Sequence, residues 1–229
     1  CAGANITGPH KVTAMNVVDG VEDAAGRIGA VNTVVVRSDG SLLGRNTDAF
    51  GFIENLRDGA PDWQAAAGPA VVLGAGGAAR AVCMALLEAG CPRVTIVNRT
   101  RERAEALALS LGRSGGGESV GVSLWPHRGQ ALKDAAVLVN TTSLGMDGQP
   151  ALELDLAELP AEALVNDVVY TPLETPLLAA ARARGNRGVD GLGMLLHQAR
   201  PAFAAWFGTE PEVDDDLRNF VLGAVRGDA

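Results

Sequence analysis

Two short polar segments near the start of the chain carry side chains that suit the reduction of a ketone. The first is Asn5-Ile6-Thr7-Gly8-Pro9-His10-Lys11 and the second is Asn46-Thr47-Asp48. Such a reduction needs a proton donor at the oxygen, and an ammonium group can donate that proton and stabilise the developing negative charge. A carboxylate beside the lysine would orient it, so Lys11 and Asp48 are the candidate catalytic pair. An ordinary surface ion pair is the alternative when these two residues are considered alone.

Amide and hydroxyl side chains in the same region suit a small substrate with several hydroxyl groups. Asn5 and Thr7 precede the lysine, and Asn32 lies within Gly29-Ala30-Val31-Asn32-Thr33. Each can donate and accept hydrogen bonds, so we expect all three to bind substrate. Asn and Thr also occur often in turns and helix caps, which is the structural alternative.

A glycine-rich turn follows the run Val71-Val72-Leu73 and precedes an alanine-rich stretch. Gly74 would permit a tight turn, Gly76 would let a pyrophosphate approach the backbone, and the amides of the helix start would bind it. A turn without a ligand is the alternative, because the chain has 29 glycines and such a pattern alone is weak. The residues that we assign to a nucleotide are Gly74, Ala75, Gly76, Gly77 and Ala78.

The end of the following strand predicts which nucleotide binds. An NAD-binding domain usually has an acidic residue here, where it binds the ribose 2′-hydroxyl. This strand ends in Asn98-Arg99-Thr100, and Arg103 follows one helical turn later. Because a guanidinium group matches a 2′-phosphate in charge and in geometry, we expect NADP, bound by these four residues. A solvated, charged helix start is the alternative.

The composition restricts the class of protein. A net charge of −8 over 229 residues argues against nucleic acid as a partner, since that needs a basic face. No apolar run has the length of a membrane span, and the start lacks a signal-peptide pattern. The three cysteines have no metal-ligand spacing, so we expect no metal and a reduced, cytoplasmic protein.

The elements that must position these motifs alternate between strand and helix after residue 69. Strands are expected at 70–73, 93–97, 119–124, 136–140, 164–169 and 187–189, and helices at 77–89, 101–111 and 175–184. This alternation predicts an α/β fold with a parallel sheet covered by helices, of the Rossmann-like, doubly wound kind. Residues 58–69 and 114–117 are rich in Gly, Pro or Ser and are expected to be connections.

The two ends of the chain have different patterns. Apolar spacing predicts a helix over 12–28, and strands at 31–36 and 42–44 should be joined by a hairpin turn at Ser38-Asp39-Gly40-Ser41. After Asp190 we expect one helix over 191–207, kinked or divided at Pro201, and a second that opens at Asp214.

Taken in order, these motifs resemble the shikimate dehydrogenase family, which reduces 3-dehydroshikimate with NADPH. The resemblance covers the chain from residue 3 to about its end. It rests on Asn5–Lys11, Gly29–Thr33, Asn46–Asp48, Gly74–Arg80, Asn98-Arg99-Thr100, Asn140-Thr141-Thr142-Ser143 and Asp190-Gly191-Leu192-Gly193-Met194. Seven blocks in the family's order are far more specific than any one of them.

The resemblance implies further site residues and a domain plan. Tyr170 and Gln198 should bind substrate, and Thr142, Val168, Gly191 and Met194 should lie near NADP. Residues 1–48 and 190–229 should form a smaller, discontinuous α/β substrate-binding domain, and 49–189 the NADP-binding domain. The family carries a strand–helix–strand region before the first motif, so the substrate domain is expected to lack its N-terminal part here. A small-molecule substrate, no nucleic acid, no membrane, and a monomer or homodimer complete the expectation.

Two other functions remain open from the sequence. A quinate/shikimate dehydrogenase would use the same chemistry, although Arg99 in place of an acidic residue argues against its NAD-using form. A catalytically silent dinucleotide-binding regulator would keep the glycine turn, but it would not need both Lys11 and Asp48.

Overall fold

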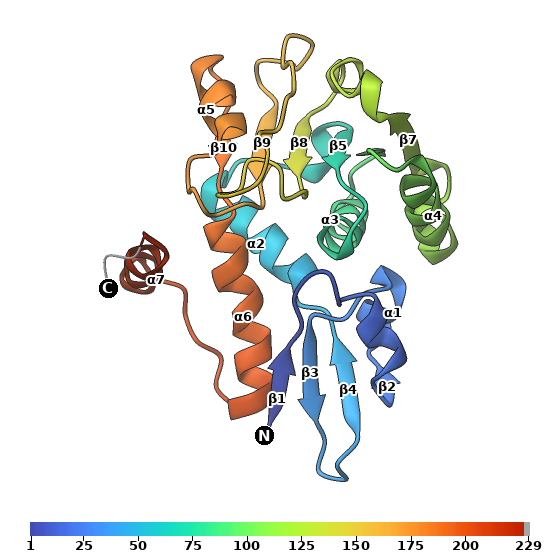
Figure 1. Cartoon of the computed structure of the whole chain (residues 1–229), viewed down its shortest axis with the longest axis vertical. Coiled ribbons are helices and arrows are strands. Elements are labelled where there is room, and N and C mark those ends of the chain that lie inside the picture. The colour runs from blue at the N-terminus through green and yellow to red at the C-terminus, as the bar shows by residue number, and fades with distance from the viewer. Residues whose placement is uncertain (227–229) are drawn as a thin grey trace.

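The computed structural model describes residues 1–226, which form two sheets joined by two long helices (Figure 1). The larger sheet has six parallel strands in the order β10-β9-β8-β5-β6-β7, the arrangement expected of a Rossmann-like domain. Its strands are β5 (Ala70–Leu73), β6 (Val94–Asn98), β7 (Val120–Leu124), β8 (Val137–Asn140), β9 (Leu164–Asp167) and β10 (Gly188–Val189).

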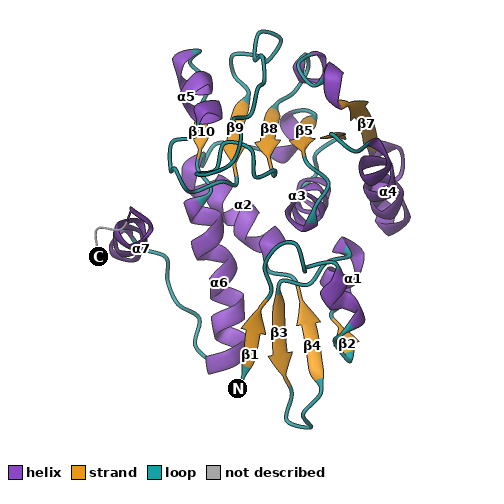
Figure 2. Cartoon of the chain, viewed as in Figure 1, coloured by secondary structure: helices purple, strands orange, loops and turns teal. Residues whose placement is uncertain are grey.

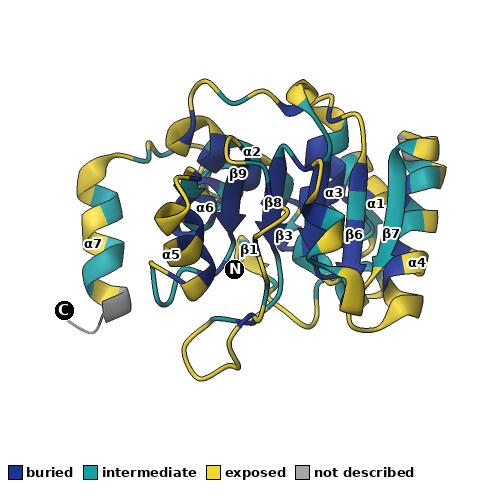
Figure 3. Ribbon diagram, turned by 90° about the horizontal axis from the view of Figure 1, so that it is seen from above, coloured by how far each residue is buried: buried dark blue, intermediate teal, exposed yellow. Residues whose placement is uncertain are grey.

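Alternating side chains of the central strands enter two separate cores, one on each face of the large sheet. Val72, Ile96 and Val139 belong to the core under helices α3 (Gly77–Glu88) and α4 (Arg101–Leu111). Their neighbours Leu73 and Leu138 belong to the other core, which is covered by helix α5 (Pro176–Ala183). A parallel sheet covered on both faces needs such continuously apolar strands, and the central strands are accordingly buried throughout (Figure 3).

The smaller sheet has the order β1-β3-β4-β2 and lies below the large sheet in Figure 1. Its strands are β1 (Gly3–Asn5), β2 (Gly20–Val21), β3 (Thr33–Val36) and β4 (Leu42–Arg45). The hairpin turn between β3 and β4 is confirmed: Asp39 accepts hydrogen bonds from the backbone N–H and the hydroxyl of Ser41, and Gly40 has a φ of 87°. Thr33, where β3 begins, pairs with Arg45, where β4 ends, so both residues lie at the same edge of the small sheet.

Two helices connect the small sheet with the large one (Figure 2). Helix α2 (Asp48–Gly59) and helix α6 (Leu192–Phe207) pack closely because glycines lie where they touch. A Cβ atom on Gly51 would lie 2.7 Å from the Cβ of Gln198, and a Cβ on Gly193 would overlap the amide of Asn55. The missing Cβ atoms let the two backbones approach, which brings the start of α2 and the middle of α6 to one place.

One expectation about the elements is wrong. The helix over 12–28 is instead a short helical turn at Thr13–Asn16, strand β2 and helix α1 (Asp23–Ile28). The apolar spacing of this segment is helical, but its pairing with β4 makes Gly20–Val21 a strand. The carboxylate of Asp19 supports this pairing by accepting a hydrogen bond from the N–H of Leu42. Strand β1 and helix α2 were not predicted.

Helix α6 runs through Pro201 without dividing. Proline removes one backbone hydrogen bond, but buried residues on both sides of it, His197 and Ala202, hold the helix in place. The connection expected at 114–117 consists of irregular helical turns at Gly112–Gly116 and Gly117–Ser119. Helix α7 (Asp215–Arg226) is confirmed and lies to one side of α6 (Figure 1). Within residues 1–226 no helix is both long and apolar enough to cross a membrane.

Candidate active site

A cavity of about 260 Å³ lies where the small sheet, the start of α2, the middle of α6 and the glycine turn meet. It collects residues that are far apart in the sequence, from Asn5 to Gln198. Eleven residues assigned from the sequence line it: Asn5, Thr7, Lys11, Asn32, Asp48, Ala78, Val168, Tyr170, Gly191, Met194 and Gln198. The substrate and catalytic residues of the prediction therefore come together in one place.

Lys11 and Asp48 form an ion pair inside this cavity, with 2.6 Å between Nζ and Oδ2. The side chains are 17% and 5% exposed, so this is not a solvated surface pair. Asp48 is the first residue of α2, where the helix dipole favours a negative charge. The lysine is held by its backbone as well, because its carbonyl accepts a hydrogen bond from Val31, and its aliphatic stem lies over Gly77.

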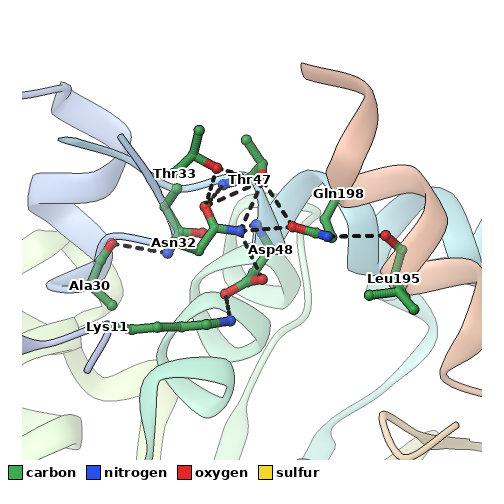
Figure 4. A network of polar contacts seen from close by, with 9 residues as sticks. Lys11, Ala30, Asn32, Thr33, Thr47, Asp48, Leu195 and Gln198 are labelled. Atoms are coloured by element: carbon green, nitrogen blue, oxygen red, sulfur yellow. Dashed lines mark hydrogen bonds and ion pairs between the residues drawn. The ribbon is translucent and has the colours of Figure 1, made fainter. Parts of the chain in front are cut away.

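The Asn32 side chain is the centre of the polar network in Figure 4. Its Nδ2 donates to Thr47 Oγ1 (2.9 Å), Asp48 Oδ1 (3.0 Å) and Gln198 Oε1 (3.1 Å). Its Oδ1 accepts from the backbone N–H of Thr47 and the hydroxyl of Thr33. An amide nitrogen has only two hydrogens, so the three acceptor oxygens share them. These oxygens can therefore still accept hydrogen bonds from substrate hydroxyls.

Gln198 reaches this network from the other side of the cavity. Its Nε2 donates to the carbonyl of Leu195 one turn back along α6, which fixes the orientation of the amide (Figure 4). Asn5 and Thr7 are exposed at the rim, and Tyr170 lies half-buried on the cofactor side. The residues assigned to substrate thus line the same cavity as the ion pair.

Sequence reasoning missed the residues that support this network. Asn46 accepts a hydrogen bond from the backbone N–H of Asp48 and donates to the carbonyl of Ala30. Thr33 and Thr47 both bond to Asn32, and all three supporting side chains are buried. Their position within the same polar segments as the catalytic residues was the available signal, since a buried polar group needs a hydrogen-bond partner.

The glycine turn fits the pyrophosphate of a dinucleotide. Gly74 follows β5 with a φ of 114°, which residues with side chains rarely adopt, and a Cβ there would lie 2.5 Å from Thr141 Oγ1. Gly76 precedes the first residue of α3, and a Cβ there would meet nothing within 4 Å. Open space before a helix N-terminus, with backbone amides facing it, is the environment that binds phosphate. Ala75 and Gly77 complete the turn.

The four residues assigned to the 2′-phosphate lie between the last residue of β6 and the first turn of α4. Asn98 ends this strand and donates from Nδ2 to the carbonyl of Thr100 (2.8 Å), which closes the turn into α4. Arg99 and Arg103 are exposed, and neither makes an ion pair within the described part of the chain. Their neighbour Arg101 is bound to Glu105, with 2.6 Å between Nε and Oε1. Two cations without a carboxylate partner beside this turn fit a phosphate group.

Thr142 lies beside the glycine turn and is held by buried side chains. A Cβ on Gly74 would lie 3.3 Å from its methyl group. Its hydroxyl donates to Asn140 Oδ1 (2.7 Å), and Asn140 in turn donates to the carboxylate of Asp167 (2.9 Å). Burial raises the pKa of Asp167 to about 6, although the hydrogen bonds that this carboxylate accepts act to lower it. Neither Asn140 nor Asp167 was assigned a role from the sequence.

Among residues 1–226 there is no group of three or more His, Cys, Asp or Glu side chains placed to hold a metal ion. Cys83 on α3 and Cys91 shortly after this helix are both buried, and burial raises the pKa of both thiols. The chemistry of the cavity is therefore that of an ammonium, a carboxylate and neutral hydrogen-bonding groups.

The Rossmann-like sheet with its glycine turn, joined to a small domain that places a lysine and a carboxylate at the shared cavity, defines a dinucleotide-dependent dehydrogenase. Family models agree with this class over three segments: "Shikimate dehydrogenase substrate binding domain" at residues 1–34, "Shikimate / quinate 5-dehydrogenase" at 62–144 and "Shikimate 5'-dehydrogenase C-terminal domain" at 191–217. The chain belongs to the shikimate dehydrogenase family.

Individual relatives support this assignment over nearly the whole chain. The shikimate dehydrogenase (NADP(+)) of Rhodospirillum rubrum is 62% identical over 97% of this chain and 78% of its own length. The quinate dehydrogenase of Corynebacterium glutamicum, solved with NAD, is 36% identical and covers 97% of this chain and 78% of its own, with a TM-score of 0.88. The shikimate 5-dehydrogenase of Thermus thermophilus, solved with NADP(H) and shikimate, is 39% identical and covers 100% and 79%, with a TM-score of 0.81.

Proposed function

We propose that this chain is an NADP-dependent shikimate dehydrogenase that reduces 3-dehydroshikimate to shikimate, with Lys11 and Asp48 as its catalytic pair. The observation that carries the proposal is the ion pair of 2.6 Å, buried in a cavity between hydrogen-bonding side chains and the glycine turn. The reaction belongs to the biosynthesis of chorismate and the aromatic amino acids.

Lys11 is the proton donor in this proposal. Its ammonium group lies inside the cavity, where it can donate to the carbonyl oxygen and stabilise the negative charge that develops there. Its side chain keeps 17% exposure, so water can restore the proton after turnover. When bound, NADPH supplies the hydride.

Asp48 orients the lysine and binds substrate in this proposal. Oδ2 accepts from the ammonium group and Oδ1 accepts from Asn32, so the carboxylate cannot turn away from the cavity. Both oxygens retain lone pairs that can accept from substrate hydroxyls. Asn32 and Gln198 provide further amide groups, and we assign Asn5, Thr7 and Tyr170 to the remaining polar groups of the substrate.

The cofactor residues divide into three groups in this proposal. The pyrophosphate binds to the turn from Gly74 to Ala78, and the 2′-phosphate binds to Arg99 and Arg103 with Asn98 and Thr100. The residues nearest the site cavity are Thr142, Val168, Gly191 and Met194. The support is the open space at Gly76, the two arginines that have no ion-pair partner among residues 1–226, and the cavity that Val168, Gly191 and Met194 line.

Residues 1–48 and 190–229 form the substrate-binding domain in this proposal, and residues 49–189 bind NADP. Residues 227–229 lie outside the described part. The division falls where α2 leaves the small sheet and where α6 returns to it. We place the enzyme in the cytoplasm, as a monomer or homodimer without nucleic-acid or membrane partners.

A direct assay tests the proposal. The purified chain is incubated with shikimate and either NADP⁺ or NAD⁺, and reduced nicotinamide is followed by absorbance; quinate replaces shikimate in a parallel series. We expect shikimate with NADP⁺ to give the highest kcat/KM. Turnover with quinate and NAD⁺ as the preferred pair would favour a quinate dehydrogenase, and binding of NADPH without turnover of either substrate would favour a silent regulator.

A further inference from the structure

Asp167 is a buried carboxylate for which the reaction just described has no use. It ends β9 and is 0% exposed. Within the described part of the chain it forms no ion pair with an arginine, lysine or histidine. Burying a carboxylate without a cation is unfavourable, so the hydrogen bonds around it show what it does.

Three donors from three segments meet at this carboxylate. Oδ1 accepts from Asn140 Nδ2 (2.9 Å) and from the backbone N–H of Val169 (3.1 Å). Oδ2 accepts from the hydroxyl of Thr175 (2.8 Å), which also caps helix α5 by accepting from Leu178. A carboxylate accepts at both oxygens, so it satisfies all three donors at once.

The bonds continue from Asp167 to two loops, one beside the glycine turn and one that lines the cavity. Asn140 Oδ1 accepts from the backbone N–H (3.1 Å) and the hydroxyl (2.7 Å) of Thr142, which lies beside Gly74. In the second loop, Val169 is fixed directly, and its neighbours Val168 and Tyr170 line the cavity. Asp167 therefore lies behind both loops and contacts neither the cavity nor the catalytic pair.

We propose that Asp167 is a positioning residue that holds the loops at 140–144 and 168–170 in the arrangement that NADPH requires. This inference rests on the proposed function, because it concerns the cofactor of that reaction. The carboxylate acts through Asn140 and Val169 and does not touch the reacting groups. Its loss should weaken the binding of NADPH and leave the binding of substrate to the small domain almost unchanged.

The test compares Asp167→Ala with Asp167→Asn in the whole chain. Alanine removes the acceptor of the N–H of Val169 and of one N–H of Asn140, whose other N–H donates to the carbonyl of Leu144. Asparagine keeps an oxygen for both donors. We expect Asp167→Ala to raise the Kd and the KM for NADPH by about 10-fold or more, because loops that lose these bonds populate the binding-competent arrangement only fractionally, which lowers the apparent affinity by that fraction. Asp167→Asn should stay within about 3-fold of the wild type on the same reasoning. Kd is measured from the fluorescence of bound NADPH, without turnover, and the KM for 3-dehydroshikimate should change little in either variant.

Asn186→Ala is the matched control, because Asn186 is equally buried and holds three loop carbonyls, those of Pro160, Ala161 and Ala163. It should lower the melting temperature without changing the Kd for NADPH. If Asp167→Ala fails to fold, Thr142→Val is the second variant. It removes the hydroxyl bond to Asn140 at the half-buried end of the network and keeps the backbone N–H bond, and it should also raise the Kd for NADPH.

Two outcomes would overturn the positioning role: a Kd for NADPH unchanged in Asp167→Ala or Thr142→Val, or an equal loss in the alanine and asparagine variants. A wild-type chain that binds no NADPH would instead refute the proposed function, so the two failures are distinguishable.

Discussion

The substrate side and the nucleotide side of the site are built differently. On the substrate side, Lys11, Asn32, Asp48 and Gln198 bond to one another. On the nucleotide side, Arg99 and Arg103 are exposed and unpaired among the described residues. Under the proposed function, the first region would hold reacting groups in a fixed geometry, which is worth more to catalysis than to binding. The second would offer charge to a phosphate and so contribute to affinity and cofactor choice.

Within this contrast, the largest effect on kcat is expected from removing the ammonium group of Lys11. Lys11→Ala should lower kcat about 10²–10⁴-fold, the usual contribution of a general acid, with a much smaller change in KM. Lys11→Met should lose as much, because it keeps the stem over Gly77 and removes only the charge. Steady-state kinetics with 3-dehydroshikimate and NADPH measure both.

His10→Ala is the control for this prediction, since His10 is exposed and does not line the site cavity. It should retain wild-type kcat. A Lys11→Ala variant with a kcat within a few-fold of wild type would remove the lysine from the chemistry.

A smaller effect, on affinity alone, is expected from the nucleotide side. Arg99→Ala should weaken NADP about 10- to 100-fold, since a hydrogen bond to a charged group is worth roughly 1.5–3 kcal/mol. NAD lacks the 2′-phosphate and should lose little. The values of kcat/KM for both cofactors test this, with Arg101→Ala as the control because Glu105 already pairs with Arg101. An equal loss for both cofactors would make Arg99 structural.

The smallest expected effect concerns stability and pH at Asp167. Its pKa is raised from 3.8 to about 6 by burial, so the folded chain binds more protons than the unfolded chain between these values. The free energy of unfolding therefore falls as pH rises through this window. Asparagine does not ionise, so the free energy of unfolding of Asp167→Asn lacks this fall. Relative to wild type, the variant should therefore become more stable by about 1 kcal/mol as the pH rises from 5 to 8.

Urea unfolding of both proteins at pH 5 and pH 8 measures this gain. A constant difference between them at the two pH values would show that ionisation of Asp167 is not its cause.

The order of elements could be predicted from the sequence wherever one local rule decided the structure. All six strands of the large sheet and helices α3, α4 and α5 lie within a few residues of the predicted ranges. Continuous apolar strands, a glycine turn and capping patterns are local signals. The segment 12–28 failed because pairing of β2 with a strand about 20 residues later overrides helical spacing.

Residues assigned to the site from the sequence line one cavity, but the residues that support them were not assigned. Polar segments identified Lys11 and Asp48, and the structure brings them within 2.6 Å. Asp167 and Asn140 have no local pattern that separates them from surface residues, because their role depends on two strand ends that meet only in the folded sheet. The close packing of α2 on α6 likewise depends on Gly51 facing Gln198, a contact between distant segments.

The most direct test of the central claim is a double-mutant cycle on Lys11 and Asp48, with kcat as the measured quantity. Asp48→Asn keeps the shape of the side chain, and Asp58→Asn at the other end of α2 is its control. If the ion pair acts as one unit, Lys11→Ala/Asp48→Asn should be little slower than the slower single variant, because residues that act together are strongly non-additive. Losses that multiply in full would show that the two residues act separately, and would contradict the account.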